Sequence, residues 1–307
     1  MVYQRDFKCV LDDKEEIPTG VMEEFKVKFP EVHFNEKEMV ALSKAIKEAN
    51  KEDFCILPFC MTLEAEALGA VINLGDEKIG PRVSDHTFTN FEDLKNLSVI
   101  DINKGRIAKV LSSVEILKSY GEQVILKVQG PFTIINSLIE PRIFYKAIRK
   151  NKEEVEKIMG VIEESIALFI EEGIKRGADI ISYGDSAGTM DILGPNMYKA
   201  YSGRYNYNVL KRVQDKINNS IIHICGITSS SLAKAEFIES KEVLVPKDIT
   251  YSEALNWIIK ERKDIKIIGH NCLRKSNRKL QNPIVWEIHL GNTPPGVYFP
   301  GKKVGDL

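Results

Sequence analysis

The stretch SIIHICG, residues 220–226, is the clearest of six short apolar runs that are each followed by a glycine, a proline or a polar turn. After each run comes a segment with helical periodicity. Buried strands that alternate with helices indicate a parallel sheet covered by helices on its faces. The other five runs are FCILPFC (54–60), VILKVQGPF (124–132), ADIISYGDSAG (178–188), EVLVP (242–246) and IKIIGHNC (265–272).

This alternation predicts an α/β fold. In a chain of 307 residues, a TIM (β/α)8 barrel, trimmed in part, is the leading architecture, and a doubly wound open sheet is the second. Residues 1–50 are expected to form an N-terminal helical extension, because Met39, Leu42 and Ile46 recur at helical spacing. No glycine-rich phosphate-binding motif follows any of the runs. We therefore predict a single barrel domain over residues 1–307.

Composition and charge narrow the class of protein. Hydrophobic residues make up 43% and charged residues 28%, which is typical of a globular protein. The net charge of -1 gives no field that would hold a polyanion, so we expect no nucleic-acid partner. No apolar run reaches the ~20 residues that a membrane-spanning helix needs. The N-terminal residues carry charges where a signal peptide would be apolar, so we expect a cytoplasmic protein with no membrane partner.

Soft metal ligands follow two of the predicted strands. His223 and Cys225 are two residues apart on one strand, so both side chains should project from the same face. An imidazole and a thiolate together suit zinc, and Cys272 after a later strand is the best third ligand. His270 stays open as a ligand, a partner of a ligand, or neither. Three protein ligands would leave a position for a substrate, whereas a buried core histidine and cysteine are the other interpretation of this motif.

Other strand ends carry groups that are candidates for a site, because α/β barrels place their functional groups there. Asp185 follows a strand, and two interpretations stay open: it contacts a substrate, or it caps the next helix. The same holds for Tyr183. The remaining candidates at these strand ends are Cys60, Gln129, Ser186 and Asp248.

Five segments in the same order resemble the uroporphyrinogen decarboxylase superfamily, and within it the branch of methylcobamide:coenzyme M methyltransferases. They are LPFCMTLEAEALGAVINLGDEKIGPRV (57–83), VQGPFTIINSLI (128–139), ADIISYGDSAGTMDILGPNMYKAY (178–201), HICG (223–226) and GHNC (269–272). The resemblance implies a TIM barrel and a zinc ion on His223, Cys225 and Cys272. It also implies methyl transfer between a corrinoid and a nucleophile that is usually a thiol.

For the other candidates, the resemblance implies supporting roles. Asp185 and Tyr183 are expected near the reacting groups, and Asp248 as a fourth, displaceable zinc ligand. The corrinoid, as methylcobalamin, is expected on a partner corrinoid protein, because nothing in this sequence resembles a histidine-bearing corrinoid loop. The acceptor would be a small molecule. The residues expected to line the corrinoid side of the pocket are Cys60, Gln129 and Ser186.

The sequence also departs from this branch. Cys225 and Cys272 are closer in sequence than is usual there, and the C-terminal segment from Asn282 does not resemble the family's closing helix. Two alternatives therefore stay open. One is a zinc-dependent thiol methyltransferase of the homocysteine type, which would use a folate donor without corrinoid. The other is a non-catalytic barrel that docks on a corrinoid protein.

Overall fold

The computed structural model describes residues 17, 19–24, 26–76 and 79–291. Its helices are α1 (Thr19–Glu24), α2 (Glu36–Asn50), α3 (Leu63–Ala67), α4 (Gly105–Ser119), α5 (Pro131–Leu138), α6 (Pro141–Lys150), α7 (Lys152–Lys175), α8 (Met190–Met197), α9 (Gly203–Val213), α10 (Gly226–Lys234) and α11 (Tyr251–Glu261). Its strands are β1 (Phe54–Leu57), β2 (Val71–Asn73), β3 (Arg82–Asp85), β4 (Gln123–Gln129), β5 (Ile180–Gly184), β6 (Ile221–Ile224), β7 (Ile238–Leu244), β8 (Ile267–Gly269) and β9 (Ile284–Leu290).

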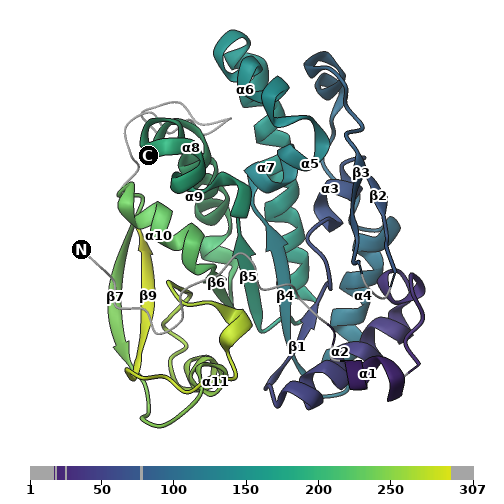
Figure 1. Ribbon diagram of the computed structural model, residues 1–307. Coiled ribbons are helices and arrows are strands. Elements are labelled where there is room, and N and C mark those ends of the chain that lie inside the picture. Colours follow the sequence, from purple (N-terminus) through teal and green to yellow (C-terminus); the bar gives the residue numbers. More distant parts are fainter. Residues whose placement is uncertain (1–16, 18, 25, 77–78, 292–307) are drawn as a thin grey trace.

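The main sheet is a parallel sheet with an antiparallel end. Its strand order is β1-β4-β5-β6-β8-β9-β7. The first five strands pair in parallel, whereas β9 runs antiparallel to both β8 and β7. Figure 1 shows β4, β5 and β6 in the middle of the molecule, with α2 and α4 on one side and β7 and β9 on the other. The predicted α/β fold is confirmed, and the barrel is trimmed: β1 and β7 stand at the two ends of the strand order.

Five of the six apolar runs contain a strand of the parallel part of the sheet, because β-branched residues favour a pleated and buried backbone. The run EVLVP (242–246) holds only the end of β7, which starts earlier and pairs antiparallel with β9, so the expectation of a parallel strand there was wrong. The helix expected around Met39 is α2, and Asn35 caps it by accepting hydrogen bonds from the backbone of its first turn. The long amphipathic stretch 141–177 is two helices, α6 and α7, which meet at Asn151. The N-terminal extension contains α1 and α2, and residues 1–16 of it lie outside the described residues.

The outer face of the sheet packs against the large helices and forms the main core. Val124, Leu126 and Val128 of β4 point to this side, and all three are fully buried. Ile181 and Tyr183 of β5 join them in the same cluster. Helices α4, α7 and α9 contribute their apolar faces to this core. None of the described helices combines the length and the apolarity that crossing a membrane would require.

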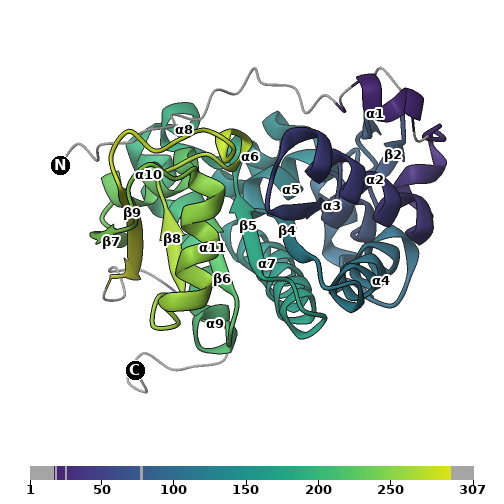
Figure 2. The ribbon, with the colours of Figure 1, turned by 90° about the horizontal axis from the view of Figure 1, so that it is seen from below.

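On the inner face of the sheet, side chains from neighbouring strands line up in layers. Ile56, Ile125, Ile180 and Ile221 stand side by side in register across four parallel strands. Helix α11 covers this inner face, because its Tyr251, Ala254, Leu255 and Ile258 belong to the same apolar cluster as Ile125, Ile180 and Ile221. Figure 2 shows α11 beside β6 and β8. The apolar layer and α11 together form a closed floor, and any site must lie on the carboxyl side of it.

Candidate functional site

A row of polar side chains follows the isoleucine layer on the inner face. Lys127 of β4, Ser182 of β5 and His223 of β6 are paired in register, so they project from the same side of the sheet. The next layer toward the carboxyl ends begins with Gln129 and Gly184. Catalytic groups of α/β barrels come from this end of the strands. We therefore place the candidate site here.

His223 is almost completely buried, at 1% exposure. Its Nε2 lies 2.9 Å from the hydroxyl of Tyr251, the first residue of α11. Its Nδ1 is buried and has no hydrogen-bond partner among the described residues. Burial lowers the pKa of His223 to about 4. The imidazole is therefore neutral at physiological pH, which is the form that binds a metal ion.

Cys225 lies directly after β6 and precedes the first residue of α10. Its backbone amide donates a hydrogen bond to the carbonyl of Tyr183, at 2.8 Å, so it continues the ladder between β5 and β6. A Cβ added to Gly184 would lie 3.2 Å from the Cβ of Cys225. Its thiol is half-buried. Cys225 therefore shares the inner face with His223, as the spacing predicts.

Cys272 follows β8, which pairs directly with β6 through His223 and Ile268. The chain after β8 passes close to the start of α10: a Cβ on Gly226 would lie 2.7 Å from the carbonyl oxygen of His270. Cys272 is 5% exposed and packs in the apolar cluster of α11. Burial raises the pKa of Tyr251, and the nearby Cys272 raises it further. Cys272 and His223 thus both lie near the phenol of Tyr251.

The types of side chain gathered here suit a metal ion only in part. The donor types fit zinc, because a neutral imidazole with an unpartnered buried nitrogen stands beside two cysteines at adjoining strand ends. The described part of the chain contains no group of three or more His, Cys, Asp or Glu side chains gathered closely enough to hold an ion. The ligand set His223, Cys225 and Cys272 stays a prediction.

Asp248, the predicted fourth ligand, lies in the exposed turn between β7 and α11. It adopts a left-handed backbone conformation, with φ of 62°. In the strand order, β7 is separated from β6 by β8 and β9. Asp248 therefore does not follow a strand that neighbours β6, and its predicted role as a zinc ligand stays a prediction.

Asp185 is fully buried after β5 and accepts several hydrogen bonds. The backbone amides of Phe132 and Thr133 donate to it at 3.2 and 2.7 Å, and the Asn206 side-chain amide donates at 2.8 Å. Burial raises its pKa, although these donors oppose the rise. Gly130 leaves it room, because a Cβ there would lie 2.4 Å from the Cβ of Asp185. Asp185 thus holds the first turn of α5 against α9.

Tyr183 and Ser186 flank this carboxylate. Tyr183 is fully buried on the outer face, and its hydroxyl donates to Asn206 at 2.6 Å. Ser186 is half-buried in the short turn after Asp185. The contacts of Asp185 and Tyr183 are those of positioning residues, and their predicted part in catalysis stays a prediction.

Gln129 and Glu64 meet at the end of β4. The backbone amide of Gln129 donates to the Glu64 carboxylate at 2.7 Å, and Glu64 is 2% exposed. Burial raises the pKa of Glu64 to about 7, and Lys127 lowers it in part. A glutamate in the first turn of a helix, as Glu64 is in α3, is ordinarily solvated. The structure instead places a titratable carboxyl group next to the polar row.

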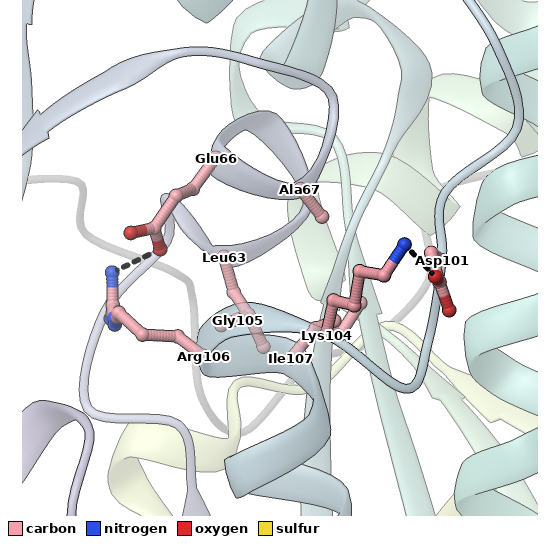
Figure 3. Close-up of a pocket in the computed structure, with 8 residues that line it drawn as sticks. All are labelled: Leu63, Glu66, Ala67, Asp101, Lys104, Gly105, Arg106 and Ile107. Atoms are coloured by element: carbon pink, nitrogen blue, oxygen red, sulfur yellow. Dashed lines mark hydrogen bonds and ion pairs between the residues drawn. The ribbon is translucent and has the colours of Figure 1, made fainter.

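Cys60 lies after β1 in contact with a buried arginine. The Arg106 guanidinium donates to the Cys60 sulfur at 3.0 Å and to Glu66 at 2.7 Å. Arg106 and Glu66 also line a pocket of about 270 Å³ between α3 and α4. Figure 3 shows this ion pair on one side of the pocket and the pair of Lys104 and Asp101 on the other. Cys60 thus belongs to a charged cluster around α3 beside the edge strand β1, whereas His223 lies on β6, which β4 and β5 separate from β1.

Several residues in this region are not among the predicted site residues. Lys127 and Ser182 have a local signal, since each is a polar residue inside an apolar strand and two positions before its end. Tyr251 has no such local signal in the sequence, because it is the packing of α11 on the inner face that brings it to His223.

Comparison with known proteins found a matching family model and several similar proteins. The family model described as Uroporphyrinogen decarboxylase (URO-D) matches residues 16–273. A methylcobamide:CoM methyltransferase of Methanosarcina acetivorans is 26% identical over 283 residues, which are 91% of this chain and 78% of that protein. Another, of Methanosarcina mazei, is 27% identical over 221 residues, which are 70% of this chain and 65% of that protein.

A solved structure, a methyltransferase from Methanosarcina mazei, has the same fold. The two superpose with a TM-score of 0.61 at 23% sequence identity. The match covers 68% of this chain and 62% of the other, so the chain spans less than two thirds of the length of that protein. This likeness supports the α/β architecture.

Proposed function

The chain belongs to the uroporphyrinogen decarboxylase family, and we propose that it transfers a methyl group between a corrinoid and a small thiol held on zinc. The names of two relatives support the corrinoid and the thiol, since both are methylcobamide:CoM methyltransferases. We propose further that methylcobalamin is presented by a separate corrinoid protein. The chain would receive it at the carboxyl ends of the strands, where the polar row lies.

One observation carries this proposal. His223 is a buried, neutral imidazole whose Nδ1 has no hydrogen-bond partner among the described residues. A buried polar atom without a partner costs about 1–3 kcal/mol, so such an atom needs an explanation. A bound metal ion supplies one, because the lone pair of a neutral imidazole nitrogen is a common ligand. Cys225 on the same face supplies a second ligand of the right type.

His223, Cys225 and Cys272 would hold the zinc ion, and Asp248 would approach as a fourth ligand from the turn before α11. Bound zinc lowers the pKa of a coordinated thiol, so that the thiolate exists at neutral pH. The chain therefore needs no separate general base for the acceptor. Its own residues close the floor with the isoleucine layer and α11, which keeps water away from one side of the site.

The proposed methyl transfer needs no reactant other than the methylcorrinoid and the thiol. The sulfur of the acceptor attacks the methyl carbon, a sulfur–carbon bond forms, and the cobalt–carbon bond breaks with its electron pair left on cobalt. Such a displacement depends mainly on position and alignment. We propose that Asp185, through its bonds to the α5 backbone, and Tyr183 hold the strand ends in place for it. We also propose that the part of the site that receives the corrinoid is lined by Cys60, Gln129 and Ser186.

The test uses purified protein with free methylcobalamin and two thiols, coenzyme M and homocysteine. We expect demethylation of methylcobalamin, followed by its absorbance, together with about one zinc per chain by elemental analysis. Cys225→Ser and Cys272→Ser should each lose zinc and activity.

Cys55→Ala is the matched control. Burial raises the pKa of the Cys55 thiol to about 11, and its side chain packs in the main core. It should keep both zinc and activity. A zinc content in Cys272→Ser equal to that of the wild type would contradict the proposal that Cys272 is the third ligand. Methylation from a folate donor without corrinoid would favour the homocysteine-type enzyme, and a stable, metal-free and inactive protein would favour a docking module.

A further inference from the structure

Lys127 places a positive charge on the inner face of the sheet, within the otherwise apolar strand β4. Its neighbours Leu126 and Val128 are fully buried in the main core on the outer face. Ile125, two residues before it, packs in the apolar layer under α11. Because side chains alternate along a strand, Lys127 leaves β4 on the inner face, one layer closer to the carboxyl ends than this floor. A lysine at such a position ordinarily has a partner of opposite charge.

The layer that holds Lys127 is open to solvent. Ser182 of β5 pairs with Lys127 in register, so the two side chains leave neighbouring strands on the same face. Figure 1 shows these two strands side by side in the middle of the molecule. Lys127 and Ser182 are each half-buried, whereas the residues directly before and after them in the strands are buried. A solute that reaches the inner face can therefore contact an ammonium group and a hydroxyl group together.

An acidic group close to Lys127 is the carboxyl of Glu64, which neutralises the lysine only in part. Lys127 lowers the pKa of Glu64, but burial outweighs this effect and raises the pKa to about 7. Near neutral pH, this carboxyl group is therefore protonated in a large fraction of the molecules. A lysine that served only to neutralise Glu64 would instead keep the acid ionised. An ammonium group also has three N–H donors, so a contact with one partner does not exhaust it.

An ammonium group next to a hydroxyl group favours an anion over a neutral solute. Both groups can donate hydrogen bonds, and a carboxylate or a sulfonate offers several oxygen acceptors. Hydrogen bonds between charged groups are roughly twice as strong as those between neutral groups. A neutral solute in the same place would displace water from the ammonium group without supplying a compensating charge.

We propose that Lys127 and Ser182 bind the acidic group, a carboxylate or a sulfonate, of the small molecule that enters at the carboxyl ends of the strands. Both residues would then determine specificity for an acidic ligand. This inference rests on the proposed function only for identifying that ligand as the thiol acceptor. Binding of the acidic group itself requires neither a metal nor a corrinoid, so the two proposals can fail separately.

The first experiment measures binding by calorimetry in protein without added metal or corrinoid. The probes are ethanesulfonate and ethyl methyl sulfone, which has a similar shape and no charge, and only the sulfonate should bind. Lys127→Met should weaken its binding about 10–100-fold, as expected for the loss of a hydrogen bond between charged groups. Ser182→Ala should weaken it as well. Lys127→Arg keeps the charge and should retain binding.

Lys47→Met is the matched control for this experiment. Lys47 also pairs with a glutamate, Glu122, but at the amino end of β4. This variant should bind ethanesulfonate like the wild type. Equal binding of the two probes, an equal loss in Lys47→Met, or unchanged binding in Lys127→Met or Ser182→Ala would overturn the inference.

The second experiment measures methyl transfer from free methylcobalamin to two thiols. Coenzyme M ends in a sulfonate, and 2-mercaptoethanol ends in a neutral hydroxyl. The ratio of kcat/KM for coenzyme M to that for 2-mercaptoethanol should fall about 10–100-fold in Lys127→Met, mainly through KM, and stay constant in Lys47→Met. An unchanged ratio in Lys127→Met would refute the role of the lysine. If neither thiol is methylated, the proposed function fails, and the binding of ethanesulfonate still decides this inference.

Discussion

Glu64 is expected to make the stability of this protein fall as the pH rises toward neutrality. Its carboxyl group is 2% exposed beside the polar row, and burial is the largest cause that raises its pKa from 4.5 to about 7. The folded chain then holds a proton on Glu64 that the unfolded chain has already released. The perturbation that tests this is Glu64→Gln. A glutamine oxygen keeps an acceptor for the Gln129 amide, but it does not titrate.

The sign and the size follow from proton linkage. The stabilisation due to a raised pKa is complete below pH 4.5 and is lost as the pH rises through about 7. At 1.36 kcal/mol for each pH unit between the two pKa values, the loss is about 3 kcal/mol. The wild type should therefore lose about 3 kcal/mol of unfolding free energy, relative to Glu64→Gln, between pH 4.5 and pH 8.

Urea unfolding at a series of pH values measures this difference directly. Lys127→Met is an internal check, because Lys127 lowers the pKa of Glu64. Removing the cation should move the wild-type loss to a higher pH. Parallel stability curves for the wild type and Glu64→Gln over the whole range would refute the reasoning, and an effect of Lys127→Met in the opposite direction would refute the assigned cause.

Three further substitutions test other parts of the structure. Gly130→Ala should lower the urea unfolding free energy by about 1–3 kcal/mol, since the new Cβ would lie 2.4 Å from that of Asp185; an unchanged value would contradict the close approach. The unfolding free energy of Glu163→Gln should rise by about 3 kcal/mol relative to that of the wild type between pH 4.5 and pH 8, because burial raises the pKa of Glu163 from 4.5 to about 7. A difference in urea unfolding that stays constant over this pH range would count against this. Arg106→Met should cost about 1–3 kcal/mol in thermal unfolding, because it leaves the buried Cys60 sulfur and the partly buried Glu66 carboxylate without their donor. The exposed Arg142→Met should stay within about 0.5 kcal/mol, and equal losses in the two variants would refute the role of burial.

The sequence predicts the parallel strands well, because each is short, apolar and followed by a turn. It does not predict β9, although IVWEIHL (284–290) has strand-forming residues. The reason is that β9 pairs antiparallel between β8 and β7, and such a pairing depends on distant parts of the chain. The division of residues 141–177 into α6 and α7 at Asn151 is not evident from the sequence either, since both halves keep an amphipathic pattern.

For the site, strand alternation predicts that His223 and Cys225 share a face, and the structure agrees. The link between His223 and Tyr251 lies beyond the reach of such patterns, because it depends on the side on which α11 packs. The burial of Glu64 was likewise hidden, since a glutamate in the first turn of a helix is ordinarily solvated.

Helix α11 contributes both to the apolar core and to the candidate site. Its apolar side packs on the inner face of the sheet, and the side chain of its first residue, Tyr251, contacts the His223 imidazole. Repacking around Leu255 or Ile258 would shift the helix and, with it, the phenol. Substitutions in the apolar cluster of α11 are therefore expected to move the Tyr251 hydroxyl relative to His223 although neither of the two residues is changed.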